Sequence, residues 1–375
     1  MVDRQSSSPS RRALYVGERV YRRSSFPASH PLAIPRAAAV EEMCRALGWL
    51  DGAFLESPVA TRAQLLRFHD ASYIDALERA DREGLATIED RERFALGTMS
   101  NPVFKGVFER ASTTVGGSIL AAQRAMEGRL VFHPAGGTHH GQKARASGFC
   151  YFNDPVFAIL EMLTLGAQRV AYIDFDAHHG DGVEDAFADD PRVLTISIHE
   201  DGRWPHTGAL AERRAGQARN LPVPQGLNND EFALLVDEAV ALLIERFQPD
   251  GLVCVVGADA LRGDPLARLS LSNNALQRAV QRVAALAPAG VVLGGGGYNP
   301  WTLVRCWSGL WGRLAGLRAP DPLPVEAKTM LARFACDLVD DDDIDPAWLT
   351  SLDDPPFGGP VRGEIREIVA AVLAP

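Results

Sequence analysis

Residues 169–181 read RVAYIDFDAHHGD, and this stretch decides the fold. Its first part, Arg169–Phe175, is a mostly apolar run with the length and composition of a buried strand. Acidic residues and histidines follow it directly. In open α/β sheets, catalytic and ligand-binding side chains collect beyond the carboxyl ends of the strands. The stretch therefore predicts a parallel sheet with a polar site at one edge.

The rest of the chain repeats this alternation of short apolar runs and longer amphipathic stretches. Further strands are predicted at Ala13–Val16, Leu130–His133, Val193–Ile198, Gly251–Val256 and Gly290–Leu293. Helices are predicted at Ala37–Leu47, Ser72–Ala80, Phe104–Met126, Pro155–Leu165, Asp230–Arg246, Asn274–Leu286 and Trp301–Leu314. Strands that alternate with helices predict an α/β protein, in which a mostly parallel sheet has helices on both faces.

The composition is that of a globular protein with a large core. The chain has 375 residues, of which 46% are hydrophobic and 23% charged, and its formal net charge is -10. These values exclude a disordered or fibrous protein. The acidic balance argues against a protein that binds nucleic acid by neutralising phosphates, and it fits cationic substrates or partners.

Cysteine usage and the N-terminal sequence bear on the compartment. The cysteines are far apart and form no C-x-x-C pair, so neither a thiolate zinc ribbon nor a disulfide framework is predicted. Residues 1–12 are polar, and no apolar run is long enough for a signal peptide or a membrane span. We expect a soluble cytoplasmic protein with a flexible segment 1–12, a single domain over 13–375, and no membrane partner.

Acidic residues and histidines of the opening stretch predict a metal site. Asp174, Asp176 and His178 alternate, so in an extended chain they point to the same side. Two carboxylates and an imidazole grouped in this way call for a cation. Asp259 follows the run Gly251–Val256 and supplies a third acidic ligand, although on its own it could equally cap a helix. Asp176, His178 and Asp259 would leave a position open for water, as in a catalytic zinc site, but Fe²⁺, Co²⁺ or Mn²⁺ would also suit these ligands.

A second histidine pair, His139 and His140, lies beyond the strand predicted at Leu130–His133. Two adjacent histidines at a strand end indicate acid–base chemistry. Asp174 and Asp181 are candidates to bond the other ring nitrogen of each histidine, which would fix its tautomer and raise its basicity.

A glycine run follows the last predicted strand. Gly294–Gly297 allows a sharp turn that brings Tyr298 beside the strand end, and its spacing is not that of a dinucleotide-binding loop. A tyrosine hydroxyl in this place could stabilise a tetrahedral oxyanion.

Together these segments make the chain similar to the zinc-dependent histone deacetylase family. The similarity is greatest to its bacterial branch of histone-deacetylase-like and acetoin-utilisation-type deacetylases. It extends from about residue 13 into the tail around 340–362. The motifs that carry it are 30–36, 134–140, 148–154, 174–182, 257–265 and 293–299.

The resemblance implies a fold and two kinds of cation. The fold is the arginase/deacetylase fold, a single mostly parallel sheet of about eight strands with helices on both faces. A structural potassium ion would lie near the zinc. The zinc ligands would be Asp176, His178 and Asp259. The potassium ligands would be Asp174, Asp176, His178, Ser197 and Ile198.

The same resemblance assigns catalytic roles. His140 would be the general base and acid, and His139 its electrostatic neighbour. Asp181 would pair with His140 and Asp174 with His139. Tyr298 would donate to the oxyanion.

The resemblance also implies a tunnel for the acyl-lysine stem. Its walls would be formed by Gly148, Phe149, Trp204 and Leu266. Trp204 stands where the family usually has phenylalanine. Arg36 would match a buried arginine beneath the site, where acetate leaves.

Two positions depart from related patterns. The family has a rim carboxylate that holds the backbone of a peptide substrate, and here Met99 and Ser100 occupy that segment, with Ser100 in place of the carboxylate. This change admits small acylated amines. Arginase-type ureohydrolases carry an aspartate for a second metal where this chain has Gly180, which disfavours a binuclear manganese site.

We therefore predict a zinc amidohydrolase, of bacterial type, that removes acetyl or a similar short acyl group from the ε-amine of lysine in proteins or peptides. One alternative is hydrolysis of acetylated polyamines or other small acylated amines. Another is a deacylase that prefers an acyl group other than acetyl. A third is a catalytically silent module that binds acyl-lysine.

Overall fold

A computed structural model describes residues 13–23, 26–27, 30–215 and 217–374. The segment 1–12, expected to be flexible, lies outside these residues. Within them, no helix combines the length and the apolar character needed to cross a membrane.

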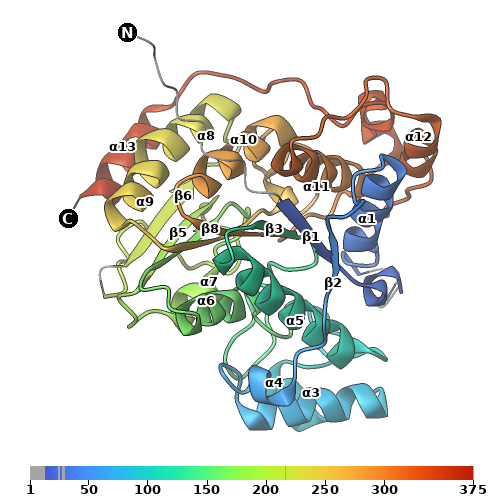
Figure 1. The fold of residues 1–375 in the computed structure, drawn as a ribbon, viewed down its shortest axis with the longest axis vertical. Helices are drawn as coiled ribbons and strands as arrows, with labels where there is room; N and C mark the ends of the chain where they lie inside the picture. The colour runs from blue at the N-terminus through green and yellow to red at the C-terminus, as the bar shows by residue number, and fades with distance from the viewer. Residues whose placement is uncertain (1–12, 24–25, 28–29, 216, 375) are drawn as a thin grey trace.

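A single eight-stranded sheet forms the centre of the molecule, and all of its strand pairings are parallel (Figure 1). The strand order is β2-β1-β3-β8-β7-β4-β5-β6. The strands are β1 (Ala13–Gly17), β2 (Phe54–Glu56), β3 (Leu130–His133), β4 (Val170–Asp174), β5 (Val193–Glu200), β6 (Ala218–Val223), β7 (Gly251–Val255) and β8 (Ala289–Leu293).

The two strands without a predicted counterpart, β2 and β6, lie at the two edges of the sheet. β2 has only three residues and is partly exposed. β6 reads ARNLPV, and its polar residues and proline break the apolar run that marks a central strand. Edge strands need no continuous apolar sequence, because one side of each has no neighbour to pack against.

Helices surround the sheet. The α-helices are α1 (Arg36–Ala46), α2 (Arg62–Leu65), α3 (Ala71–Glu83), α4 (Ile88–Phe94), α5 (Val107–Met126), α6 (Asp154–Thr164), α7 (Asp181–Ala186), α8 (Asn229–Leu235), α9 (Ala241–Phe247), α10 (Asn273–Ala284), α11 (Pro300–Ala315), α12 (Val325–Leu331) and α13 (Gly363–Leu373). Short helices with other hydrogen-bond patterns are η1 (Arg19–Arg22), η2 (Val236–Val240), η3 (Ala258–Ala260), η4 (Asp341–Asp343) and η5 (Pro346–Leu349). The helix predicted over Asp230–Arg246 is present as α8 and α9, joined by a π-helical turn at η2.

Each face of the sheet has its own apolar core. One core joins the sheet to α1, α8, α9, α10, α11 and α13. The other joins it to α5, α6 and α7. A third cluster lies outside α5, between that helix and α3 and α4, which project from the body of the molecule (Figure 1). The predicted arrangement, helices on both faces of a parallel sheet, is confirmed.

The strand order brings the predicted site residues together. β3, β8, β7 and β4 are neighbours at the centre of the sheet and run in the same direction. The segments that carry His139, Asp176, Asp259 and Tyr298 each follow the carboxyl end of one of these strands. Because parallel strands end at the same edge, the four segments meet there.

The tail of the chain is attached to α11 by a buried arginine. The guanidinium of Arg305 is fully buried, and its Nη1 lies 2.7 Å from Asp354 Oδ1. Its Nε and Nη2 donate to the carbonyl oxygens of Ser351 (2.6 Å) and Asp353 (2.9 Å). Arg305 therefore holds the segment 351–354 against the body together with Asn273, whose Nδ2 donates to the carbonyl oxygen of Leu352 at 2.6 Å.

We predict that Arg305→Met lowers the free energy of unfolding by about 3 kcal/mol, because it leaves buried carbonyl and carboxylate groups without their partner. Urea denaturation followed by circular dichroism measures the change. Arg318→Met, at an exposed position just beyond α11, should change stability by less than about 0.5 kcal/mol. If the wild-type protein unfolded in two separate transitions, 13–375 would not be a single domain.

Candidate active site

Three buried side chains form an acid–histidine–acid cluster at the carboxyl edge of the sheet. One ligand-type atom from each of Asp176, His178 and Asp259 lies within 4.8 Å of the other two. His178 Nδ1 is 3.2 Å from Asp176 Oδ1 and 2.9 Å from Asp259 Oδ2. Both carboxylates are fully buried. The cluster thus presents two oxygens and one ring nitrogen to a common point, as a divalent cation requires.

The alternation predicted that Asp174, Asp176 and His178 would point to the same side of an extended chain, and this prediction is wrong. β4 ends at Asp174, and Asp176 and His178 lie in the loop that follows. The alternative for Asp259, a helix N-cap, is also wrong. Asp259 lies inside the short helix η3, and its Oδ1 accepts a hydrogen bond from the backbone nitrogen of Ala177, across the loop.

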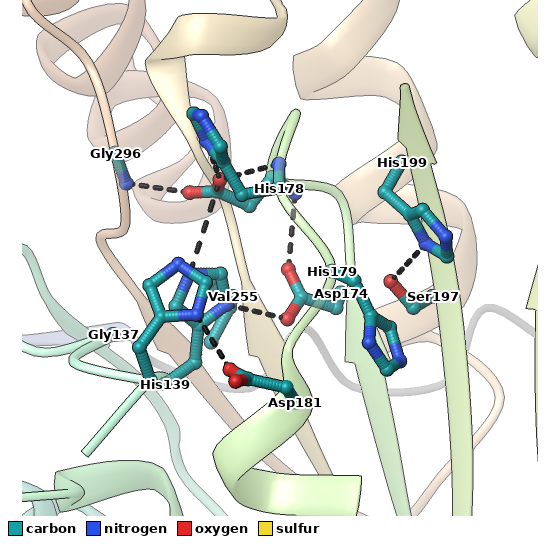
Figure 2. Close-up of polar contacts among 12 residues, drawn as sticks. Gly137, His139, Asp174, His178, His179, Asp181, Ser197, His199, Val255 and Gly296 are labelled. Carbon is teal, nitrogen blue, oxygen red and sulfur yellow. Dashed lines mark hydrogen bonds and ion pairs between the residues drawn. The ribbon is translucent and has the colours of Figure 1, made fainter. Parts of the chain in front are cut away.

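Glycine is required where the backbone passes the two carboxylates. A Cβ atom on Gly296 would overlap Asp259 Oδ2, and one on Gly257 would overlap both Asp176 and Asp259. The absence of side chains lets the Gly296 backbone nitrogen donate to Asp176 Oδ2 at 2.5 Å (Figure 2). The glycine run predicted to form a sharp turn therefore also holds a carboxylate of the cluster.

The pKa values of His178 and Asp259 are shifted because the cluster holds two carboxylates close together. Burial alone would lower the pKa of His178, but hydrogen bonds to Asp176 and Asp259 raise it to about 10. Burial and the charge of Asp176 raise the pKa of Asp259. The two carboxylates thus attract positive charge to this point, and the residues fit a cation.

Two histidine–aspartate pairs lie beside the cluster. His139 Nδ1 is 2.7 Å from Asp174 Oδ2, and His140 Nδ1 is 2.7 Å from Asp181 Oδ1. The two imidazole rings are 3.9 Å apart, centroid to centroid. Figure 2 shows Asp174 and Asp181 beside His139, below the His178 ring. Each carboxylate occupies the Nδ1 side of its histidine, so each Nε2 is available on the other side of the ring.

The two histidines have opposite pKa shifts. Burial would lower the pKa of His139, but the charges of Asp174 and Asp176 raise it to about 9. Burial and the positive charge of His139 lower the pKa of His140 to about 4, although Asp181 acts in the other direction. At neutral pH His140 is therefore an unprotonated base next to a protonated neighbour.

Tyr298 lies across the same space. Its side chain is buried, with its ring centroid 5.9 Å from that of Phe149. Asp264 Oδ2 accepts from the backbone nitrogen of Tyr298 at 2.7 Å, and Oδ1 accepts from that of Leu266 at 2.9 Å. Burial and the charge of Asp259 raise the pKa of Tyr298, so the hydroxyl stays protonated and can donate.

The sequence analysis did not identify Asn153 and Asp154, which hold the loop that carries His139 and His140 (the histidine loop). Asn153 Nδ2 donates to the carbonyl oxygens of His139 (3.1 Å) and Gly141 (2.9 Å). Asp154 accepts from the backbone nitrogens of Gly137 (3.1 Å) and Thr138 (2.8 Å). The signal was present, because an Asn-Asp-Pro sequence at a helix start supplies side chains that bond neighbouring backbone.

A cavity leads from the surface to this site. Its lining includes all four predicted tunnel residues, namely Gly148, Phe149, Trp204 and Leu266. His140, His178 and Tyr298 line its inner part. The Trp204 ring is 41% exposed and meets the His140 ring edge-on at 4.6 Å between centroids.

The two residues predicted at the rim, Met99 and Ser100, differ in their position relative to the cavity. Ser100 lines the mouth of the cavity, whereas Met99 is 95% exposed and is not part of the lining. Asp201 and the ion pair between Arg203 and Glu200 (2.6 Å) also line the mouth. Asp201 forms no ion pair within the described part of the chain. Arg36, expected to be buried, is only half-buried.

Of the residues predicted to hold potassium, Asp174, Ser197 and Ile198 lie on the adjacent strands β4 and β5, and Asp176 and His178 lie in the loop after β4. Asp174 at the end of β4 is in register with Ser197 on β5. Ser197 Oγ is 2.9 Å from His199 Nδ1 (Figure 2). Ile198 is buried in the core against the α8–α11 layer.

Comparisons with known proteins agree with this geometry. A family model described as histone deacetylase domain matches residues 30–314. The acetoin utilization protein AcuC of Bacillus subtilis is 34% identical over 332 residues, which cover 84% of this chain and 85% of AcuC. Histone deacetylase 8 of Xenopus tropicalis is 32% identical over 298 residues, covering 77% of this chain and 80% of its own.

Solved structures give the same result. The crystal structure of an HDAC homolog from Aquifex aeolicus matches with a TM-score of 0.92 and 34% identity, covering 97% of this chain and 100% of that one. The structure of an HDAC homolog complexed with SAHA matches with the same TM-score, identity and coverage. The chain therefore belongs to the histone deacetylase family of metal-dependent amidohydrolases and is a deacetylase.

Proposed function

We propose that the protein removes acetyl, or a similar short acyl group, from the ε-amine of lysine in proteins or peptides. The observation that carries the proposal is the meeting of three groups at the inner end of one cavity. These are the acid–histidine–acid cluster of Asp176, His178 and Asp259, the unprotonated His140 and the protonated Tyr298. Amide hydrolysis needs an activated water, a proton carrier and an oxyanion donor, and each has a candidate here.

In this proposal Asp176, His178 and Asp259 hold zinc, although Fe²⁺ or Co²⁺ would also suit two carboxylates and one imidazole. The bound ion would act as a Lewis acid and lower the pKa of water. Potassium is proposed at the neighbouring segments of β4 and β5. The register of Asp174 against Ser197 supports it.

His140 takes a proton from the attacking water, and Asp181 keeps its Nδ1 protonated so that Nε2 is the base. His139, paired with Asp174, stays charged and lowers the pKa of its neighbour. As the carbon–nitrogen bond breaks, a protonated histidine gives its proton to the leaving amine. Water thus adds across the amide bond, and the products are the free amine and the carboxylic acid.

Tyr298 donates a hydrogen bond from its hydroxyl to the carbonyl oxygen as negative charge develops there. Phe149 and Trp204 enclose the stem of the acyl-lysine, and Gly148 provides space because a Cβ atom there would overlap Trp204. We propose that acetate leaves past Arg36, which lines the small cavity behind His139 and His140.

A second candidate function is the hydrolysis of acetylated polyamines or other small acylated amines. Ser100 at the mouth gives no carboxylate to hold a peptide backbone. Asp201, exposed at the same mouth and without an ion-pair partner among the described residues, gives a carboxylate that could face a distant ammonium group. Ser100 and Asp201 are therefore the two positions that bear on the choice between a peptide substrate and a small acylated amine.

We also propose that the protein works in the cytoplasm. All five of its cysteines are free, and four of them are buried, as expected for a protein in a reducing compartment.

The metal assignment predicts that Asp259→Asn weakens zinc binding by about a hundredfold or more, because it removes one of three ligands. Metal content after dialysis and chelator competition measure this. Asp201→Asn, a matched change at the cavity mouth, should keep the wild-type metal content. Full metal retention by Asp259→Asn would contradict the ligand assignment.

The oxyanion assignment predicts that Tyr298→Phe lowers kcat by about a hundred- to a thousandfold and leaves the metal content unchanged. Steady-state acetate release from an acetyl-lysine peptide measures the rate. Tyr15→Phe is the control, since the Tyr15 hydroxyl is buried in the core without a hydrogen-bond partner among the described residues. Near wild-type turnover by Tyr298→Phe would refute the role.

The substrate assignment predicts faster acetate release by the zinc-loaded protein from an acetyl-lysine peptide than from an acetylated polyamine. Comparison of kcat/KM for the two substrates decides between the candidates. Faster polyamine turnover, reduced at least about tenfold by Asp201→Asn, would instead establish the second candidate. No turnover of any acylated amine by metal-loaded protein would favour the silent binding module.

A further inference from the structure

Two arginines face a second cavity, which lies behind the site and has about 80 Å³ of space for water-sized groups. Its walls are mostly apolar and come from η1, the loop before α1, α5 and the segment around Phe149. Five residues line both this cavity and the small one beside His139 and His140. They are Leu32, Arg36, Ala135, Thr138 and Phe149. The second cavity therefore continues from the reacting centre, and Arg36 and Arg110 both line it.

Arg36 stands at the junction of the two cavities. Its Nη1 donates to the carbonyl oxygens of Gly295 (2.9 Å) and Gly297 (3.1 Å). Its guanidinium also lies 6.0 Å from the centroid of the Tyr298 ring. No carboxylate pairs with Arg36 in the described part of the chain, so its charge is not balanced there.

Arg110, the fourth residue of α5, reaches the same cavity from the end of the first turn of that helix. Its Nη1 has one long hydrogen bond, of 3.4 Å, to the carbonyl oxygen of Val20. The guanidinium lies 5.3 Å from the centroid of the Tyr21 ring. Burial lowers the pKa of Arg110, and the positive charge of Arg36 adds to this effect. Among the described residues Arg110 has no acidic partner either.

The buried carboxylate of Asp154 already has its own hydrogen-bond donors. Asp154 accepts hydrogen bonds from Ser118 Oγ (2.6 Å) and from the backbone nitrogens of Gly137 and Thr138. It is thus used to hold the histidine loop. Two guanidinium groups next to a mostly apolar cavity are costly without a counter-charge, so the cavity favours an anion.

We propose that this cavity binds the free carboxylate of a dicarboxylic acyl group, so that the enzyme hydrolyses succinyl- or glutaryl-lysine in preference to apolar acyl-lysines of equal length. This inference rests on the proposed function, because the acyl carbonyl must lie at the site already described. The chain of the acyl group would extend through the small cavity, past Arg36, toward Arg110. A carboxylate between two guanidinium groups gains charge-assisted hydrogen bonds from both.

The reaction remains a hydrolysis with water as the only co-reactant. The amide carbon–nitrogen bond breaks, and the water oxygen forms a new bond to the acyl carbon. Both water protons end on the leaving ε-amine, which is released as an ammonium group. The second product is the dicarboxylate, which carries one more negative charge than acetate.

The test compares acyl groups that differ only at their far end. Succinyl and butyryl have the same number of carbons, as do glutaryl and pentanoyl. With zinc-loaded enzyme and one peptide sequence, we expect kcat/KM to favour the dicarboxylic member of at least one pair by about tenfold to a hundredfold. Arg110→Gln should reduce this ratio at least about tenfold, and Arg110→Lys should retain part of it.

Arg124→Gln is the matched control. Arg124 is on the same helix, α5, but it is exposed and paired with Glu127. Its substitution should leave the ratio unchanged. Because the readout is a ratio of two substrates within each variant, a general loss of folded or metal-loaded enzyme does not affect it.

Product inhibition tests whether the cavity binds the far carboxylate of a dicarboxylic acyl group or any carboxylate that hydrolysis releases. Succinate should inhibit acetyl-lysine hydrolysis more strongly than acetate, and Arg110→Gln should remove that difference. Equal inhibition by the two acids, weakened equally in Arg110→Gln, would overturn the proposal, because the cavity would then serve any released carboxylate. A preference for butyryl over succinyl would also overturn it and indicate an apolar acyl site. If no acyl-lysine were hydrolysed at all, the proposed function itself would fail.

Discussion

Two carboxylates buried against one imidazole are the constraint on which the rest of the site depends. Asp176 and Asp259 are fully buried, and both contact His178 Nδ1. A buried carboxylate is stable only when it is paired or hydrogen-bonded. Gly296 and Gly257 are glycines because the backbone must pass these oxygens closely. The cluster thus determines which residues can stand at the ends of β7 and β8, as well as the need for a cation.

The two histidines of the acid–base pair, His139 and His140, are likewise each paired with a carboxylate. Asp174 and Asp181 keep their histidines in fixed orientations at 2.7 Å, and the charge on His139 keeps the pKa of His140 low. Around the site, Asp174, Asp176, Asp181 and Asp259 each contact an imidazole, whereas Asp154 and Asp264 are held by backbone and hydroxyl donors. Arg36 and Arg110 differ, since no carboxylate balances them within the described residues. This contrast is why the cavity behind the site is informative about the acyl group.

Sequence patterns predicted the central strands and the residues that follow them. Strands β3, β4, β5, β7 and β8 are buried, and their apolar runs can be read directly. The edge strands β2 and β6 were missed because one side of each lacks a neighbour. Alternation along residues 174–178 identified two members of the acid–histidine–acid cluster for a wrong local reason, because the strand ends at Asp174 and a loop follows. The roles of Asn153 and Asp154 were missed although the Asn-Asp-Pro sequence signals capping side chains, because the backbone groups that they bond lie 12 to 17 residues away in the chain.

By itself, the sequence determined the fold class and the chemical types at the strand ends. Those features depend on local apolar periodicity and on residue identity, and both are written along the chain. Only the tertiary structure decided which residues meet. The strand order places β3, β8, β7 and β4 side by side, and so brings His139, Asp176 and Asp259 together from distant segments. It also turns Arg110, an ordinary position within a long helix, toward Arg36. Contacts between distant segments follow from packing, because a side chain's neighbours in space are set by topology and not by its neighbours in sequence.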